Sequence, residues 1–158
     1  MNFDREWMDE TTRAYLAGLV DGEGSITIRK TSRQRTNTHQ YSLQLVIANT
    51  SLKLSKWMSV LGIKGYIWNR NAINQNPKWR LSFTYHFNGK EARDLLWLLL
   101  PYLVIKPEQA RLGINFCEVK GFHQGYRPSP ETIDMLEIMY QQMSDLNHSD
   151  YIIPEGGD

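Results

Sequence analysis

One short stretch, Leu16 to Ser25, constrains this chain more than any other. It reads LAGLVDGEGS, an apolar run that passes into an acidic, glycine-broken end. Small residues recur one helical turn apart at Ala14, Gly18 and Gly22. A helix face built from small residues lets a second backbone approach closely. The stretch therefore predicts a helix that packs against another helix.

The acidic end of this stretch poses an electrostatic problem. Gly22 and Gly24 are expected to end the helix and to flank the single carboxylate of Glu23. A helix C-terminus already carries partial negative charge, so a carboxylate there is unfavourable without a cation. A capped core helix with solvated acids is the alternative interpretation.

Composition limits the class of protein. A chain of 158 residues is expected to form one domain, residues 1–158, with a sizeable core. No apolar run reaches transmembrane length, and the N-terminus carries four acids instead of a signal peptide. The single cysteine, Cys117, excludes an intrachain disulfide and a cysteine-based zinc site, and is expected in the core. We expect a soluble intracellular protein.

Charge is strongly segregated along the chain. Residues 24–90 contain eleven Lys and Arg and no Asp or Glu, whereas the remainder contains all 17 acids and only seven bases. Such segregation within one domain predicts a basic face, which is typical of a protein that binds a polyanion. A solvated surface without a ligand is the alternative.

Two segments in the basic region alternate with period two. Ile26 and Ile28 alternate with polar residues, and about 40–49 places Tyr41, Leu43, Leu45 and Ile47 opposite polar partners. Both segments are expected to be strands with one core face and one hydrogen-bonding face. The first strand is expected to have about twelve residues, with a hairpin-like stretch around 34–38. Strands are also expected at 66–71 and 78–87.

Helices are expected around these strands. The first runs from a cap at Asp9, Thr11 or Thr12 to about Asp21, and the second from a Ser51 cap to Leu61. Three more are expected at 90–100 with an Asn88 cap, at 107–119 and at 131–146, followed by a loose tail over 147–158. The order αββαββααα predicts an α+β fold, an αββαββα core with a four-stranded antiparallel sheet and extra C-terminal helices.

The polar face of this sheet is suited to a nucleic acid. Arg pairs with guanine, Gln and Asn pair with adenine, and a two-stranded ribbon fits the major groove. The candidate DNA-binding residues are Ser25, Thr27, Arg29, Thr31, Arg33, Arg35, Gln40, Ser42, Gln44, Trp68, Arg70, Lys78, Arg80 and Ser82. An ordinary solvated sheet face is the alternative.

The stretch LAGLVDGEGS resembles the signature of the LAGLIDADG family of homing endonucleases and related intron maturases. In that family the motif helix packs against a second copy of itself, and its terminal acid binds a divalent metal ion at the scissile phosphates. This chain has one copy of the motif, so the resemblance implies a homodimer. The interface is then expected to contain Ala14, Gly18, Leu19, Asp21 and Gly22.

The resemblance also implies a set of site residues. Glu23 and the Gly22 carbonyl would bind Mg²⁺ or Mn²⁺, and two copies of Glu23 would come from the two chains. Asn49 would orient the nucleophilic water, and Lys53 and Lys106 would lie near the scissile phosphate. Their alternatives are a turn former for Asn49, a solvated helix residue for Lys53 and a residue that precedes a helix for Lys106.

Three functions remain open from the sequence. The first is a homodimeric, metal-dependent endonuclease that cuts both strands of a long pseudo-palindromic site in double-stranded DNA and, by the resemblance, leaves short 3′ overhangs. The second is an RNA maturase or a non-cleaving DNA-binding protein of the same fold. The third, a structural helix-packing domain, leaves the acid-free segment unexplained.

Overall fold

The motif stretch lies in helix α1 (Glu10–Glu23) of the computed structural model, which describes residues 8–33, 38–63, 66–68, 82–122 and 128–149. The Asp9 side chain caps the helix by accepting a hydrogen bond from the Thr12 N–H at 2.7 Å. Leu16, Ala17 and Val20 form its buried stripe. The expected helix and its cap at Asp9 are confirmed.

The end of α1 differs from the prediction. Gly22 does not end the helix, because Glu23 is its last residue and the chain enters strand β1 at Gly24 with no intervening loop. A Cβ atom on Gly24 would lie 2.5 Å from the Val20 carbonyl oxygen, so only glycine fits this direct passage. The Glu23 carboxylate is therefore held at a junction between helix and strand.

Four strands form one antiparallel sheet in the order β1-β2-β4-β3. They are β1 (Gly24–Arg33), β2 (Thr38–Asn49), β3 (Tyr66–Trp68) and β4 (Ser82–Asn88). In the β1–β2 pair, Gly24 lies opposite Ile47 and Arg33 opposite Thr38. The α+β fold with a four-stranded antiparallel sheet is confirmed. The described part of the first strand has ten residues, and residues 34–37 and 69–81 of the predicted strands lie outside the described residues.

Side chains alternate across this sheet as the sequence predicts. One face is buried against the helices and consists of Ile26, Ile28, Tyr41, Leu43, Leu45, Ile47, Phe83, Tyr85 and Phe87. Burial of this apolar face, at about 25 cal/mol per Å², is the main force that holds the helices on the sheet. Cys117 lies in the same core, and burial raises the pKa of its thiol to about 11, as expected of a packing residue.

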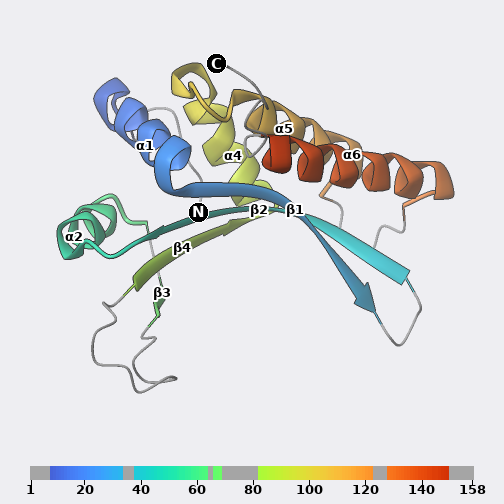
Figure 1. Ribbon diagram of the computed structural model, residues 1–158, viewed down its shortest axis with the longest axis horizontal. Coiled ribbons are helices and arrows are strands. Elements are labelled where there is room, and N and C mark those ends of the chain that lie inside the picture. Colours follow the sequence, from blue (N-terminus) through green and yellow to red (C-terminus); the bar gives the residue numbers. More distant parts are fainter. Residues whose placement is uncertain (1–7, 34–37, 64–65, 69–81, 123–127, 150–158) are drawn as a thin grey trace, which may run out of the picture.

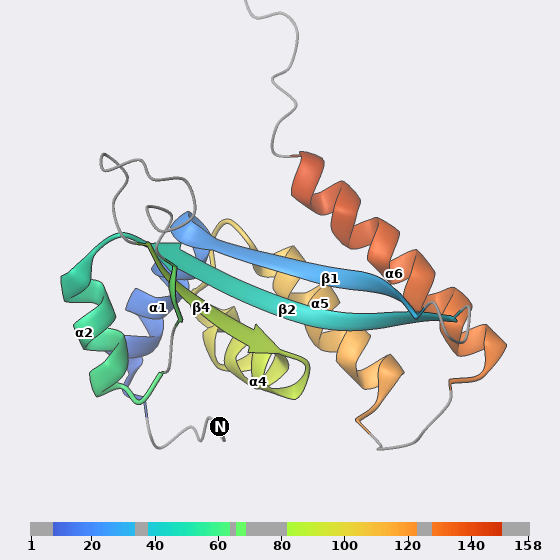
Figure 2. The ribbon, with the colours of Figure 1, turned by 90° about the horizontal axis from the view of Figure 1, so that it is seen from below.

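The remaining helices cover only one face of the sheet. Helices α4 (Lys90–Leu99), α5 (Pro107–Lys120) and α6 (Pro130–Ser149) lie with α1 above the sheet in Figure 1, and α2 (Leu52–Val60) lies at one end. A 3-10 turn, η1 (Leu100–Tyr102), follows α4 at Pro101, which ends that helix as predicted. The opposite, concave face of β1 and β2 carries no helix (Figure 2). That face is left open for a partner.

The remaining differences between the predicted and the observed structure lie at the helix ends. Ser51 caps α2 as expected, through a hydrogen bond from the Leu54 N–H. Asn88 was expected to cap α4, but it is the last residue of β4, and Gly89 precedes the helix with φ 54°. This left-handed backbone favours glycine. Helix α6 continues to Ser149, so the tail does not loosen at 147 as predicted.

No helix among the described residues has both the length and the apolar character needed to cross a membrane.

Candidate nucleic-acid interface and acidic site

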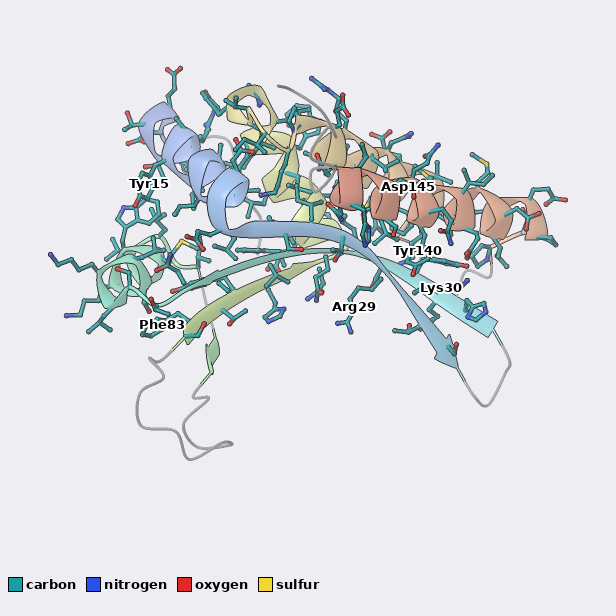
Figure 3. The ribbon with its side chains drawn as sticks, in the orientation of Figure 1. Tyr15, Arg29, Lys30, Phe83, Tyr140 and Asp145 are labelled. Carbon is teal, nitrogen blue, oxygen red and sulfur yellow. The ribbon has the colours of Figure 1, made fainter. Side chains whose placement is uncertain are left out.

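The open face of the sheet carries the predicted polar residues in cross-strand rows. Thr27 lies opposite Gln44, Arg29 opposite Ser42 and Thr31 opposite Gln40. On this face, Ser25, Arg29, Thr31 and Gln40 are exposed, and Thr27, Ser42, Gln44 and Ser82 are partly exposed. Arg29 points away from the helices (Figure 3). These side chains form a continuous row of donors and acceptors along a curved surface.

Some interactions already organise this face. The Gln44 Nε2 donates to Asn88 Oδ1 at 3.0 Å, and the Thr31 hydroxyl donates to the Gln40 carbonyl at 3.4 Å. Such contacts restrict the rotamers of side chains that are otherwise exposed. The predicted contacts at Arg35, Arg70, Lys78 and Arg80 lie outside the described residues, as do the side chains of Arg33 and Trp68.

The basic segment does not place all its charge on the sheet face. Lys30 shares the core side of β1 with Ile28, and its ammonium forms a 2.7 Å ion pair with Glu137 of α6. Lys53 lies on α2, and Lys90 forms an ion pair with Asp94 on α4. The predicted basic face is therefore wrong in part, because a charge count along the sequence does not distinguish the two sides of a strand.

Glu23 lies exposed in a cavity of about 630 Å³ at the start of β1. Gly22, Ser25, Thr27 and Lys106 line the same cavity. The structure thus brings Glu23, Gly22 and Lys106 together, although Lys106 follows them by more than 80 residues. No group of three or more His, Cys, Asp or Glu side chains that could hold a metal ion occurs among the described residues.

Lys106 covers the C-terminal end of the motif helix. Its ammonium donates to the carbonyl oxygens of Val20, at 3.1 Å, and of Asp21. The last four carbonyls of a helix have no intrahelical partner and favour a cation. A lysine has three N–H donors, so one remains for a ligand in the cavity.

The carboxylate of Asp21 was expected at the subunit interface but is used inside the chain. Asp21 is buried, and its two oxygens accept hydrogen bonds from the backbone N–H groups of Val104 at 2.8 Å and Lys106 at 2.9 Å. A buried carboxylate needs such partners. The interaction joins the end of α1 to the turn before α5 and so positions Lys106. Sequence reasoning missed this role because the two partners are distant along the chain.

Asn49 and Lys53 do not line the Glu23 cavity. Asn49 ends β2, where its Oδ1 accepts a hydrogen bond from the Ser51 N–H at 2.7 Å. Since Ile47 pairs with Gly24, Asn49 lies at the same end of the sheet as Glu23. Lys53 is exposed on α2 and lines a separate cavity of about 370 Å³ beside α1. There, Tyr15 meets the Trp57 ring edge-on, with centroids 4.9 Å apart.

The small-residue face of α1 is open. Ala14, Gly18 and Gly22 are exposed and Leu19 is partly exposed. A Cβ atom placed on Gly18 or on Gly22 would meet no atom within 4 Å. Packing within the chain therefore does not require a glycine at Gly18. The close approach of a second molecule to this face would explain the glycine.

The C-terminal end of α6 forms a wall of the Glu23 cavity that the sequence did not predict. Ser144, Asn147 and His148 line it together with Tyr140 and Met143. The sequence did contain a signal for this part of α6, namely the helical spacing of Leu136, Met139 and Met143. All three side chains are buried, so the apolar stripe of the helix continues toward this end.

The chain thus combines a mixed α+β fold, an open polar sheet face and an acid at the end of a small-residue helix. The profile of the LAGLIDADG endonuclease family matches residues 16–104. This match spans more than half of the chain, and the chain belongs to that family. None of the curated protein sequences compared with the chain matches it.

Solved structures support the same fold. The homing endonuclease I-CvuI, in complex with the I-CreI DNA target, has 22% sequence identity and a TM-score of 0.66, covering 94% of this chain and 85% of that one. The archaeal intron-encoded I-Vdi141I, complexed with DNA, has 14% identity and a TM-score of 0.65, covering 94% and 87%. I-GzeII, also bound to DNA, has 16% identity and a TM-score of 0.63, covering 91% of this chain and 50% of its own.

Proposed function

We propose that this chain is a homing endonuclease that acts as a homodimer and hydrolyses both strands of a long pseudo-palindromic DNA site with a divalent metal ion. Residues 1–158 would act as one endonuclease domain in each subunit. The observation that carries the proposal is the position of Glu23. It is the last residue of the motif helix, and it lies exposed where an open polar sheet begins.

The open sheet face is the proposed DNA surface. The ten residues of β1 span roughly 33 Å at ~3.3 Å per residue, which is close to one turn of B-DNA at ~34 Å. Rows such as Arg29–Ser42 and Thr27–Gln44 present donors and acceptors that suit base edges in the major groove. The related structures of I-CvuI and I-Vdi141I are complexes with DNA, which supports the same partner for this chain.

A second copy of the chain is the proposed partner of α1. The exposed face at Ala14, Gly18 and Gly22 allows two helices to approach closely, and Gly18 has open space around it. Val104 and Ile105, in the turn that Asp21 holds against α1, are 84% and 61% exposed. An isologous contact would bury these apolar side chains and bring the two Glu23 carboxylates together.

Glu23 and the Gly22 carbonyl would hold Mg²⁺ or Mn²⁺ at the centre of this dimer. A single carboxylate suffices only if a second Glu23 and DNA phosphates complete the shell, and Mg²⁺ commonly binds through one or two carboxylates and substrate phosphates. Glu23 is exposed and the Gly22 carbonyl belongs to the last turn of α1, so both are open to a ligand. The related I-CvuI structures were determined with Mg or Ca.

When bound, the metal ion would neutralise the charge that develops on the phosphate and would activate water. The remaining N–H of Lys106 would donate to a phosphate oxygen near Glu23. With its Oδ1 on the Ser51 N–H, Asn49 retains an amide NH₂ that would orient the attacking water from the same end of the sheet. Lys53, on the neighbouring α2, would offset phosphate charge.

A cleavage selection on randomised double-stranded DNA tests the proposal and reveals the site. The wild type should cut a long, approximately two-fold symmetric sequence in Mg²⁺ and bind it without cutting in Ca²⁺. Glu23→Gln should bind the selected site with nearly unchanged affinity and lose cleavage by at least ~100-fold, because charge stabilisation at the phosphate depends on the carboxylate.

Glu118→Gln is the matched control, since Glu118 is exposed on α5 and does not line the cavity. It should cut like the wild type. Cleavage by Glu23→Gln in Mg²⁺ would show that the metal assignment is wrong. Binding by the wild type without cleavage in any tested metal would instead support a non-cleaving DNA-binding protein.

A further inference from the structure

One wall of the Glu23 cavity has no role in the proposed function. It is formed by the last turns of α6, which contribute Tyr140, Met143, Ser144, Asn147 and His148. Helix α6 runs along β1, the edge strand of the sheet (Figure 2). A DNA strand that extends from the open sheet face past the edge strand β1 would therefore lie beside the end of α6.

The last turn of α6 is fixed to the strand that begins at the acidic site. The Asn147 Nδ2 donates to the Ile26 carbonyl at 2.9 Å. Because β1 is an edge strand, carbonyls on its outer side have no strand partner, and this contact satisfies one of them. Ile26 is the third residue of β1. The position of His148 is therefore set by the same strand that follows Glu23.

The imidazole of His148 is also held in one orientation. Its Nδ1 lies 2.6 Å from the Ser144 carbonyl oxygen. A carbonyl oxygen only accepts, so Nδ1 carries the proton in this contact. The Nε2 atom then accepts in the neutral ring and donates in the imidazolium ring. A ring fixed through one nitrogen and exposed to the cavity is well suited to hold a ligand with the other.

The two helix ends at this cavity would otherwise repel an anion. Both α1 and α6 end there, and free carbonyls give each end partial negative charge. Lys106 donates to the Val20 and Asp21 carbonyls at the end of α1, and the His148 ring donates to the Ser144 carbonyl one turn before the end of α6. The lining also supplies the hydroxyls of Ser25, Thr27 and Ser144. The lining thus combines donors that suit a phosphate with the carboxylate of Glu23 and the apolar side chains of Ile28, Ile105 and Met143.

We propose that His148, with a proton on both ring nitrogens, donates a hydrogen bond from Nε2 to a backbone phosphate of the DNA, and that the end of α6 is therefore part of the DNA surface. The contacted phosphate belongs to the strand that leaves the sheet across β1, next to the phosphate at Glu23. This inference rests on the proposed DNA-binding function. It adds a contact on the helix side of β1, which the polar face of the sheet does not supply.

Ethylation interference on the selected DNA site, in Ca²⁺ so that the DNA stays intact, tests this contact. In the wild type, ethylation of the phosphate at His148 should weaken binding. In His148→Ala this phosphate should lose its interference in each half-site, while the other interfering phosphates remain. Binding should weaken by at least about tenfold, as expected for a hydrogen bond to a charged group. His148→Arg should restore the interference, because arginine binds phosphate.

Gln142→Ala is the control, since Gln142 is exposed on the same helix and does not line the cavity. It should leave the interference pattern and the affinity unchanged. An identical pattern in the wild type and His148→Ala would overturn the assignment of His148, even if cleavage by the wild type supports the endonuclease. Absence of DNA binding by the wild type would overturn the proposed function itself.

Discussion

The buried carboxylate of Asp21 joins two parts of the chain that lie more than 80 residues apart. It accepts hydrogen bonds from two backbone N–H groups, at Val104 and Lys106, and the Lys106 ammonium returns to the carbonyls of Val20 and Asp21. The end of the motif helix and the start of α5 therefore form one rigid unit. Glu23 and Lys106 keep their relative positions within this unit.

Asp21→Asn should weaken this unit. The amide offers one acceptor and turns a donor toward the second backbone N–H, so one buried hydrogen bond is lost. The free energy of unfolding should fall by about 2 kcal/mol, measured by urea denaturation with far-UV circular dichroism. Asp145→Asn, at an exposed position on α6 (Figure 3), should change it little. Equal stabilities of Asp21→Asn and the wild type would contradict the importance of the contact.

At the scale of elements, α6 is attached to the sheet by an ion pair as well as by its apolar stripe. Glu137 forms a 2.7 Å ion pair with Lys30 and accepts from the Tyr41 hydroxyl. The Lys30 ammonium also lies 5.7 Å from the Tyr140 ring centroid. Figure 3 shows Lys30 and Tyr140 where α6 meets β1. The ammonium of Lys30, followed by the Tyr41 hydroxyl, lowers the pKa of Glu137 to about 2 from its ordinary value of 4.5.

This depressed pKa gives a pH-dependent contribution to stability. Protonation is harder in the folded chain, so the ion pair stabilises the fold above about pH 4.5 and the contribution is lost as pH falls toward 2. The difference in Tm between the wild type and Glu137→Gln should be largest above pH 4.5 and should shrink on acidification.

Asp134→Asn is a suitable control on the same helix, since Asp134 is exposed on α6. A Tm difference for Glu137→Gln that does not change between pH 6 and pH 2.5 would mean that the ion pair has no measurable effect on stability.

The sequence predicted features that depend on neighbouring residues, and it missed features that depend on residues far apart in the chain. Ile26, Ile28 and Leu43 identified the core face because alternation is a property of neighbouring residues. Asn88 was wrongly predicted to cap α4 because an amide side chain suits a helix cap. The start of α4 depends instead on the left-handed backbone of Gly89. The end of α6 was missed because Asn147 is ordered by the distant Ile26 carbonyl. In the site, the motif located Glu23 and the resemblance located Lys106, but neither indicated the link through Asp21.

For the whole molecule, the central question is whether two chains meet through α1. Gly18→Leu separates assembly from folding. Leucine has a higher helix propensity than glycine by roughly 0.5–1 kcal/mol, and its Cβ meets no atom of the chain within 4 Å. The substitution should therefore not destabilise the fold of the single chain. It should sediment near the 18.5 kDa mass of one chain, whereas the wild type should sediment at about twice that mass.

Asn115→Leu tests whether an added leucine alone disturbs assembly, since Asn115 is exposed on α5 and lies away from the motif face. It should remain dimeric in analytical ultracentrifugation. If Gly18→Leu also sediments as a dimer, the subunits must meet through a surface other than the small-residue face of α1.

The direct passage from α1 into β1 at Gly24 has a consequence for redesign. The acid belongs to the helix, whereas the residues that would read bases begin two positions later, at Ser25 on the strand. If these residues read bases as proposed, substitutions at Arg29, Gln40 or Gln44 change the strands and leave the residue that carries the acid on the helix. If the proposed homodimer meets through α1, engineered versions with new target sequences should leave ends of the same length and polarity, because the acids that flank the two cuts lie on the paired helices.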